Sequence, residues 1–129
     1  MNIRKLRWIF DFRRVDGMSV LFKKRTGLPM NIYFDEFDRK TRHGKRIKFQ
    51  SNKKDSAGIS CNYYTMTISD TPEVIVRSRM RNELSSKDVD LLRRWVISNK
   101  DLLLRLTSSD DPFDVIDFIE QSNNASSLV

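Results

Sequence analysis

The sequence contains few of the residue types on which enzyme and metal sites depend. Its 129 residues include one histidine, one cysteine, four glycines and three prolines. Because Cys61 is the only thiol, no intramolecular disulfide can form, which fits a reducing cytoplasm. A zinc site needs three or four His, Cys or carboxylate ligands, and His43 with Cys61 supplies only two. We therefore expect neither a metal nor a cofactor.

Other classes of protein are excluded by what the chain does not contain. No apolar run approaches the roughly 20 residues that cross a bilayer, and Asp11 and Arg13 interrupt the short apolar stretch after Trp8. We expect neither a membrane helix nor a signal peptide, and hence a cytoplasmic protein. The glycines form no phosphate-cradling loop, and no strand carries the Glu-x-Lys element common in nuclease cores. Since His43 lacks a partner to orient it, we predict a binding protein rather than an enzyme.

Positive charge is abundant and unevenly distributed. The formal net charge is +7. Residues 1–60 hold sixteen Lys and Arg against six Asp and Glu, residues 61–105 hold eight against six, and residues 106–129 hold none against five. A basic body with an acidic end indicates a polyanionic partner, or it serves solubility alone. The charge distribution by itself leaves both interpretations open.

Residues 6–22 carry the clearest pattern of secondary structure. Apolar residues alternate with polar ones on both sides of the Asp-Gly pair at 16–17, which is typical of a β-hairpin. A two-residue loop would pair Val15 with Met18 and turn the two apolar stripes to opposite faces, which a strand with one buried face does not tolerate. We therefore predict a three-residue loop, in which Arg14 pairs with Met18 and the glycine takes a positive φ.

Further segments resemble strands and then helices. Strand composition or alternation marks the segments 30–35, 46–50, 59–69 and 74–76. An apolar stripe that includes Trp95 predicts a helix over residues 86–106, with a capping box at 85–88. An Asp-Pro pair at 111–112 predicts the start of a second, short helix.

The order of strands followed by helices predicts one α+β domain over residues 1–121. We expect an antiparallel sheet of five to six strands that starts with the hairpin. A long helix covers one face, with Trp95 beneath the sheet, and a short C-terminal helix follows. The polar residues 122–129 are expected to form a disordered tail.

The helix that contains residues 91–103 resembles the closing helix of a group of short bacterial domains of unknown function. In that group an L-V-x-x-W segment precedes a polar stretch and a paired leucine, and here L-L-R-R-W at 91–95 precedes K-D-L-L at 100–103. Its members are small β-rich proteins often encoded near toxin–antitoxin-like gene pairs, so the resemblance implies a protein of a bacterium or a mobile element. The group also carries a strand with two histidines around a phenylalanine. Residues 43–47 contain His43 alone, so no metal or catalytic role follows from the resemblance.

Alternation places many basic side chains on the sheet face opposite the expected core. The candidate binding residues are Arg7, Arg13, Lys23, Arg25, Tyr33, Arg46, Lys48, Arg77, Arg79 and Arg81. The last three stand at every second residue, so in an extended chain they align about 6.5–7 Å apart, close to the spacing of phosphates along a nucleic-acid strand. Tyr33 is expected to be available for stacking on the same face.

Such a face would track a phosphate backbone. We expect a non-catalytic accessory protein that binds nucleic acid or a nucleoprotein complex. Two alternatives stay open. An inhibitor or antitoxin-like protein would use the same charges to cover the acidic surface of an enzyme. A small nuclease or toxin would need the carboxylates at 35–38, or Asp70 with Glu73, to bind a metal.

Overall fold

The strands form one antiparallel sheet in which neighbours along the chain are neighbours in space. The computed structural model describes residues 14–15, 18–35, 45–49, 64–75, 85–108 and 111–128. The six strands, in sheet order, are β1 (Arg14–Val15), β2 (Met18–Leu21), β3 (Ile32–Asp35), β4 (Arg46–Phe49), β5 (Tyr64–Thr67) and β6 (Val74–Ile75). Strands β3 to β6 lie within the four predicted segments, so those predictions are confirmed.

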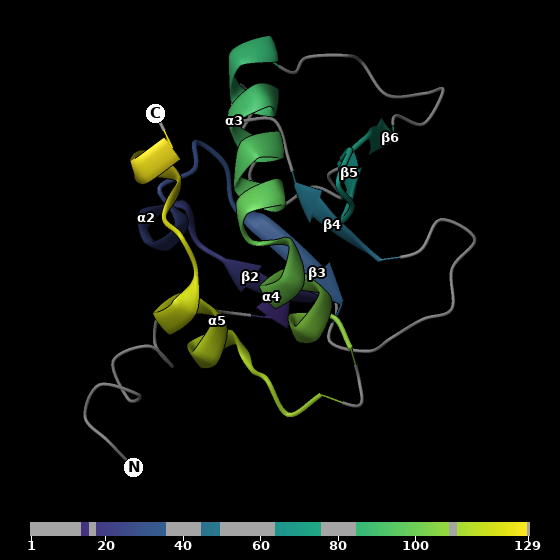
Figure 1. Ribbon diagram of the computed structural model, residues 1–129, viewed down its shortest axis with the longest axis vertical. Coiled ribbons are helices and arrows are strands. Elements are labelled where there is room, and N and C mark those ends of the chain that lie inside the picture. Colours follow the sequence, from purple (N-terminus) through teal and green to yellow (C-terminus); the bar gives the residue numbers. More distant parts are fainter. Residues whose placement is uncertain are drawn as a thin grey trace.

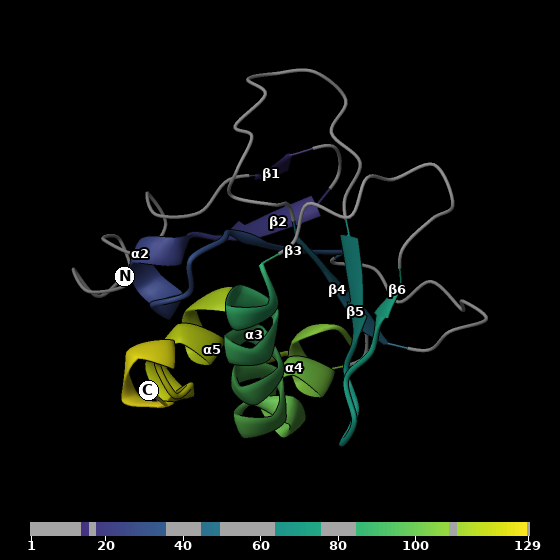
Figure 2. The same ribbon diagram turned by 90° about the horizontal axis from the view of Figure 1, so that it is seen from above.

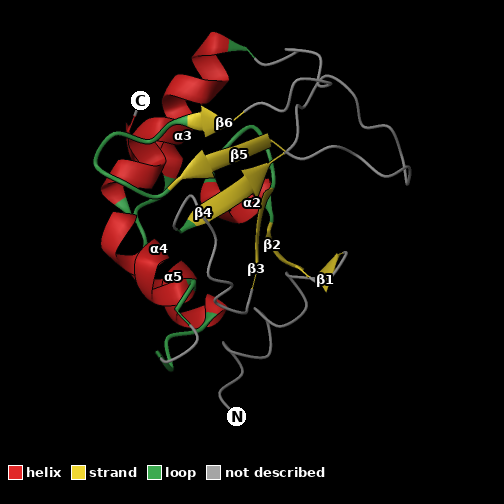
Figure 3. Ribbon diagram, turned by 90° about the vertical axis from the view of Figure 1, so that its right-hand side faces the viewer, coloured by secondary structure: helices red, strands yellow, loops and turns green. Residues whose placement is uncertain are grey.

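The helices lie together on one side of this sheet (Figures 1 and 2). They are α2 (Lys23–Thr26), α3 (Ser86–Ser98), α4 (Lys100–Leu106) and α5 (Val115–Gln121), with a 3₁₀ turn η1 (Ala125–Leu128) after them. In Figure 3 the strands stand on one side and α3, α4 and α5 on the other, which is the predicted α+β architecture. Across the described residues, no helix has the length and apolar character needed to cross a bilayer.

The core fills the space between the sheet and the helices. Ile47 and Phe49 alternate along β4 with partly exposed residues and are both 0% exposed, which is the period-two pattern of a strand with one buried face. Trp95 on α3 is also 0% exposed and packs edge-on against Phe118 of α5, with 5.8 Å between the ring centroids. The prediction that Trp95 is a core residue is confirmed.

The hairpin register differs from the prediction. Val15 pairs with Met18 and Arg14 with Ser19, so two residues rather than three join β1 and β2. The prediction assumed that β2 buries only one face. Instead both faces are buried: Leu21 enters the main core, while Val20, which is 1% exposed, forms a second apolar cluster with Tyr33. Burial on both faces removes the constraint that excluded the shorter loop. The positive φ predicted for the hairpin glycine lies outside the described residues.

The long helix predicted over residues 86–106 is interrupted. Asn99 ends α3 and precedes α4, with φ −113° and ψ 17°. Ser85 stands at the N-terminus of α3 but its side chain makes no capping hydrogen bond, so the predicted capping box is wrong. The second helix also begins later than the Asp-Pro pair. Its N-cap is Asp114, which forms a reciprocal capping box with Asp117.

The buried amide of Asn99 accounts for the interruption. Its Nδ2 donates to the carbonyl oxygens of Trp95, at 3.0 Å, and Asn123, at 3.1 Å, while the backbone N–H of Asn123 donates to its Oδ1 at 2.7 Å. Asn99 is 1% exposed. Asparagine has a low helix propensity because its side chain competes for backbone hydrogen bonds. Here the Asn99 side chain ends α3 and, through its hydrogen bonds to Asn123, connects the break between α3 and α4 to the C-terminal segment.

Residues 122–128 are an ordered part of the structure rather than the disordered tail that we expected. Ala125 is fully buried in the main core. Asn124 reaches back to α2, where its Nδ2 donates to the carbonyl oxygen of Arg25 at 3.1 Å. Gly27, which ends α2 at φ 76°, lies so close that a Cβ on it would collide with the Asn124 amide. The polar composition of this segment suggested disorder. The segment is ordered because its polar side chains bond to distant residues that only the fold brings near.

Replacing Asn99 with alanine should destabilise the protein by about 2–4 kcal/mol. The change removes three hydrogen bonds of the buried Asn99 amide, to the Trp95 carbonyl oxygen and to the partly buried backbone N–H and C=O of Asn123, and each is worth about 0.5–1.5 kcal/mol. Asn123→Ala is the matched control, because it removes an amide side chain but keeps the backbone groups that Asn99 binds. It should cost about 0.5–1.5 kcal/mol. Urea unfolding of both variants measures the difference, and equal losses would contradict the role assigned to Asn99.

Gly27→Ala should destabilise the protein more in the native chain than in an Asn124→Ala background. The native chain would suffer both the left-handed backbone penalty, about 1–2 kcal/mol, and the collision with the amide. With Asn124 shortened, the backbone penalty and the close approach of the new Cβ to the Ser126 backbone nitrogen, at 3.1 Å, should persist. A double-mutant cycle from chemical denaturation gives the coupling, and additive losses would show that the two residues do not touch.

Candidate functional site

The sheet face turned away from α3, α4 and α5 carries a row of polar and basic side chains. Because Ile47 and Phe49 point to the core, Arg46 and Lys48 of β4 project to the opposite side. Antiparallel pairing sets Lys48 beside Thr65 and Arg46 beside Thr67. All four side chains are partly exposed. We call Arg46, Lys48, Thr65 and Thr67 the outer patch.

The outer patch has the chemistry of an anion-binding surface. The two cations stand two residues apart on one strand, about 6.5–7 Å along the chain. The two threonines lie on the adjacent strand. Thr67 Oγ1 accepts from the Glu73 backbone N–H at 2.9 Å, and each hydroxyl hydrogen can still be donated to an anion. This arrangement offers positive charge and short donors, which suit phosphate oxygens.

Tyr33 belongs to the same face but does not have the exposure that we predicted. It pairs with Lys48 across β3 and β4 and with Val20 across β2 and β3. The residue is 8% exposed and packs in the apolar cluster with Val20 and Phe22. Its ring is therefore a packing element between β2 and β4, and the prediction of a stacking platform is wrong.

Lys23 and Arg25 do not lie on a strand. The chain turns into α2 directly after Phe22, whose carbonyl oxygen accepts from the backbone N–H groups of Arg25 and Thr26. Lys23 is exposed and Arg25 partly buried at this helical turn. The predicted continuation of strand alternation through residues 23–25 is wrong, and these cations lie at the end of the sheet rather than in the outer patch.

The other proposed binding residues are not placed by the structure. Arg7, Arg13, Arg77, Arg79 and Arg81 lie outside the described residues, as do His43 and Cys61. The alignment of the three arginines at 77–81 stays a prediction. Of the residues predicted for one basic face, the structure brings Arg46 and Lys48 together.

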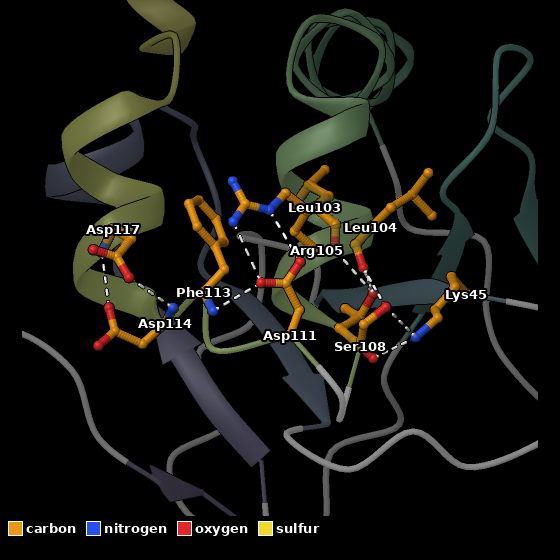
Figure 4. A network of polar contacts seen from close by, with 10 residues as sticks. Lys45, Leu103, Leu104, Arg105, Ser108, Asp111, Phe113, Asp114 and Asp117 are labelled. Carbon is orange, nitrogen blue, oxygen red and sulfur yellow. Dashed lines mark hydrogen bonds and ion pairs between the residues drawn. The ribbon is translucent and has the colours of Figure 1, made fainter.

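Lys45, the residue before the outer patch, contacts the helical layer instead. Its Nζ donates to the Thr107 carbonyl oxygen at 2.5 Å and to Ser108 Oγ at 3.2 Å (Figure 4). Thr107 ends α4, where unsatisfied carbonyls and the helix dipole favour a cation. Lys45 thus ties the start of β4 to the end of α4, which holds the strand that carries Arg46 and Lys48.

The acidic residues of the C-terminal part form local ion pairs and caps. Arg105 of α4 donates from Nε to Asp111 Oδ2 at 3.0 Å, and its guanidinium lies 4.3 Å from the centre of the Phe113 ring (Figure 4). Asp111 also accepts from the Phe113 backbone N–H. The hydrogen bond from Arg105, followed by that from Phe113, lowers the pKa of Asp111 below its usual 3.8. The same pair raises the pKa of Arg105.

Metal ligands do not gather in the part of the chain that the structure describes: it contains no group of three or more His, Cys, Asp and Glu able to hold an ion. Asp70 instead pairs with Lys100, with Nζ 2.6 Å from Oδ1. Asp90 pairs with Arg93 at 3.3 Å. These carboxylates have structural partners on the surface.

Asp111→Asn should lower stability at neutral pH and matter less in acid. Since the folded-state pKa is lowered, the charged carboxylate stabilises the fold fully above the unfolded value near 3.8, and the stabilisation is lost as pH falls through the folded pKa. Urea midpoints of the native and variant proteins should therefore differ at pH 7 and converge as the pH falls through the lowered pKa of Asp111. The control is Asp101→Asn, which removes one negative charge from an exposed position of α4 and leaves the pair of Arg105 with Asp111 in place. A gap that stays constant with pH would contradict the ion pair.

No protein-family model, no curated protein and no solved structure matches the chain. The resemblance of residues 91–103 to a group of bacterial domains therefore stays a prediction. The outer patch has to be interpreted from its own chemistry.

Proposed function

We propose that this chain is a non-catalytic binding protein for nucleic acid, and that the outer patch contacts the phosphate backbone. The observation that carries the proposal is the placement of Arg46 and Lys48 on the same side of β4, next to Thr65 and Thr67 of β5. Phosphate contacts from Arg, Lys and Thr side chains are the commonest protein contacts with nucleic acid.

The shape of the patch favours a backbone over a single small anion. Its four side chains are partly exposed along two paired strands, and none of them lines the groove found in the described part of the chain. Successive cations at about 6.5–7 Å match the repeat of phosphates along one strand. Tyr33 is buried between β2 and β4, and Phe22 packs partly buried beside it, so the outer patch itself contains charge and hydroxyl groups but no aromatic ring. We therefore expect binding with little base preference, dominated by counterion release.

The charge distribution supports an oriented approach. The cations of the outer patch face away from α5, whose exposed turn carries Asp114, Asp117 and Glu120. Figure 2 shows α5 on the helical side of the sheet, so these three carboxylates lie away from the outer patch and weaken the positive field there less than nearby carboxylates would. Such a field raises association rates and weakens with salt.

The test replaces both cations of the outer patch. Arg46→Ser with Lys48→Ser should weaken binding to a mixed-sequence single-stranded DNA or RNA. It should also flatten the slope of log affinity against log salt by about 1.4–1.8, because each phosphate contact contributes about 0.7–0.9. Fluorescence anisotropy over about 50–200 mM salt measures both effects.

A matched control makes this result specific to the outer patch. Lys87→Ser with Arg94→Ser removes the same charge from exposed positions of α3 and should change the slope by less than half as much. If both double variants change the slope equally, binding depends on net charge alone and the proposed site is overturned. The inhibitor alternative replaces this proposal if the native protein captures an acidic protein and added nucleic acid does not displace it.

A further inference from the structure

A groove lies on the other side of the molecule, between the loop after α2 and the first turns of α3. It encloses about 670 Å³, which is within the roughly 300–1,000 Å³ of small-molecule sites. Gly27, Leu28 and Pro29 form one wall, and side chains of α3 form the other. Figure 1 shows the two segments, which are far apart in the sequence, on the same side of the sheet. None of these residues belongs to the outer patch.

One stripe of α3 supplies the second wall. Lys87, Leu91 and Arg94 all line the groove, and their spacing of four and then three residues places them on one helix face. Leu91 is partly buried and faces the wall that contains Leu28 and Pro29. The stripe therefore combines an apolar centre with a cation on either side.

The charge balance of the groove favours an anion. Among the described residues, the side chains of Lys87 and Arg94 make no hydrogen bond or ion pair. Two carboxylates, Asp88 and Asp90, also line the groove, and Asp90 pairs with Arg93. With Arg93 included, three cations stand against two carboxylates, so one positive charge is in excess beside an apolar surface.

The opposite wall is held in place before any ligand arrives. Gly27 ends α2 in the left-handed region, with φ 76°, and lies against the Asn124 amide. That amide binds the Arg25 carbonyl oxygen, and Leu28 is buried in the core. A wall ordered in the free protein costs little entropy on binding.

We propose that this groove binds a small amphipathic anion. The apolar body of the ligand lies against the partly exposed Pro29 and Leu91, and its single carboxylate, sulfonate or phosphate group is held by Arg94. We assign this role to Arg94 rather than Lys87 because the planar guanidinium can donate to two oxygens of the anion at once. Lys87 lies about 10 Å from Arg94 along the helix axis, at 1.5 Å per residue, and adds attraction without a second obligatory contact.

Two probes of this chemistry test the site. Anilinonaphthalene sulfonate reports binding by its fluorescence, and octanoate, a carboxylate with an apolar chain, should displace it. Arg94→Gln should weaken both probes by about tenfold, which corresponds to the loss of one charge-assisted contact. Lys87→Gln should weaken them by about twofold to threefold. Leu91→Ser should weaken octanoate while leaving the salt dependence unchanged, since it removes apolar contact and no charge.

The controls separate this site from the outer patch and from partial unfolding. Arg46→Ser with Lys48→Ser should leave both probes unchanged, so the groove and the nucleic-acid proposal can fail independently. Amide chemical shifts on octanoate addition should change at residues 27–29 and 87–94, which a partly unfolded protein that binds the dye would not show. The proposal is overturned if the native protein binds neither probe, if Arg94→Gln binds them with native affinity while folded, or if the shift changes lie elsewhere.

Discussion

A buried amide determines how the helical layer is put together. Asn99 interrupts what would otherwise be a continuous helix and uses both ends of its side chain on the backbone of Asn123. The break lets α3 and α4 each direct leucines at the sheet, among them Leu92 and Leu103, both fully buried. The same contact brings the C-terminal segment against α3, where it covers the core and supports the turn at Gly27. One polar side chain thus helps to close the core and to hold the wall of the groove. Its burial would cost free energy if its hydrogen-bond partners were absent.

Much of the fold could be predicted from local patterns, and the errors have a common cause. Alternation located β3 to β6, and the apolar stripe located Trp95 in the core, because both depend on periodicity that the sequence displays. The hairpin register was wrong because the apolar contact of Val20 with Tyr33 makes β2 two-sided, which no local pattern indicates. The order at 122–128 depends on partners 24 residues away for Asn123 and 99 residues away for Asn124, so composition misjudged it. A low-propensity Asn99 within a predicted helix was the one available sign of the break.

The candidate sites show the same division between local and distant information. Arg46 and Lys48 were predicted because strand period alone decides their side of the sheet. Lys23 and Arg25 were misplaced because the chain bends into α2 one residue after Phe22, and Tyr33 was misjudged because its burial comes from neighbouring strands. The groove had no sequence signal as a whole. Its walls meet only in the folded chain, and the stripe at 87, 91 and 94 resembles any solvated helix face until Leu28 and Pro29 are placed opposite it.

The contact between Asn124 and Arg25 has a consequence for the order of events during translation. The sheet is a meander of neighbouring strands, so its pairs can form as each strand is synthesised. The turn at α2 receives its last hydrogen bond from a residue made 99 positions later. At about 5–20 residues per second, that delay is roughly 5–20 s on the ribosome. For this interval the turn at α2 lacks that bond, whereas α3 and α4, made before Asn124, can already cover the apolar face of the sheet, so the C-terminal segment fixes the α2 turn last.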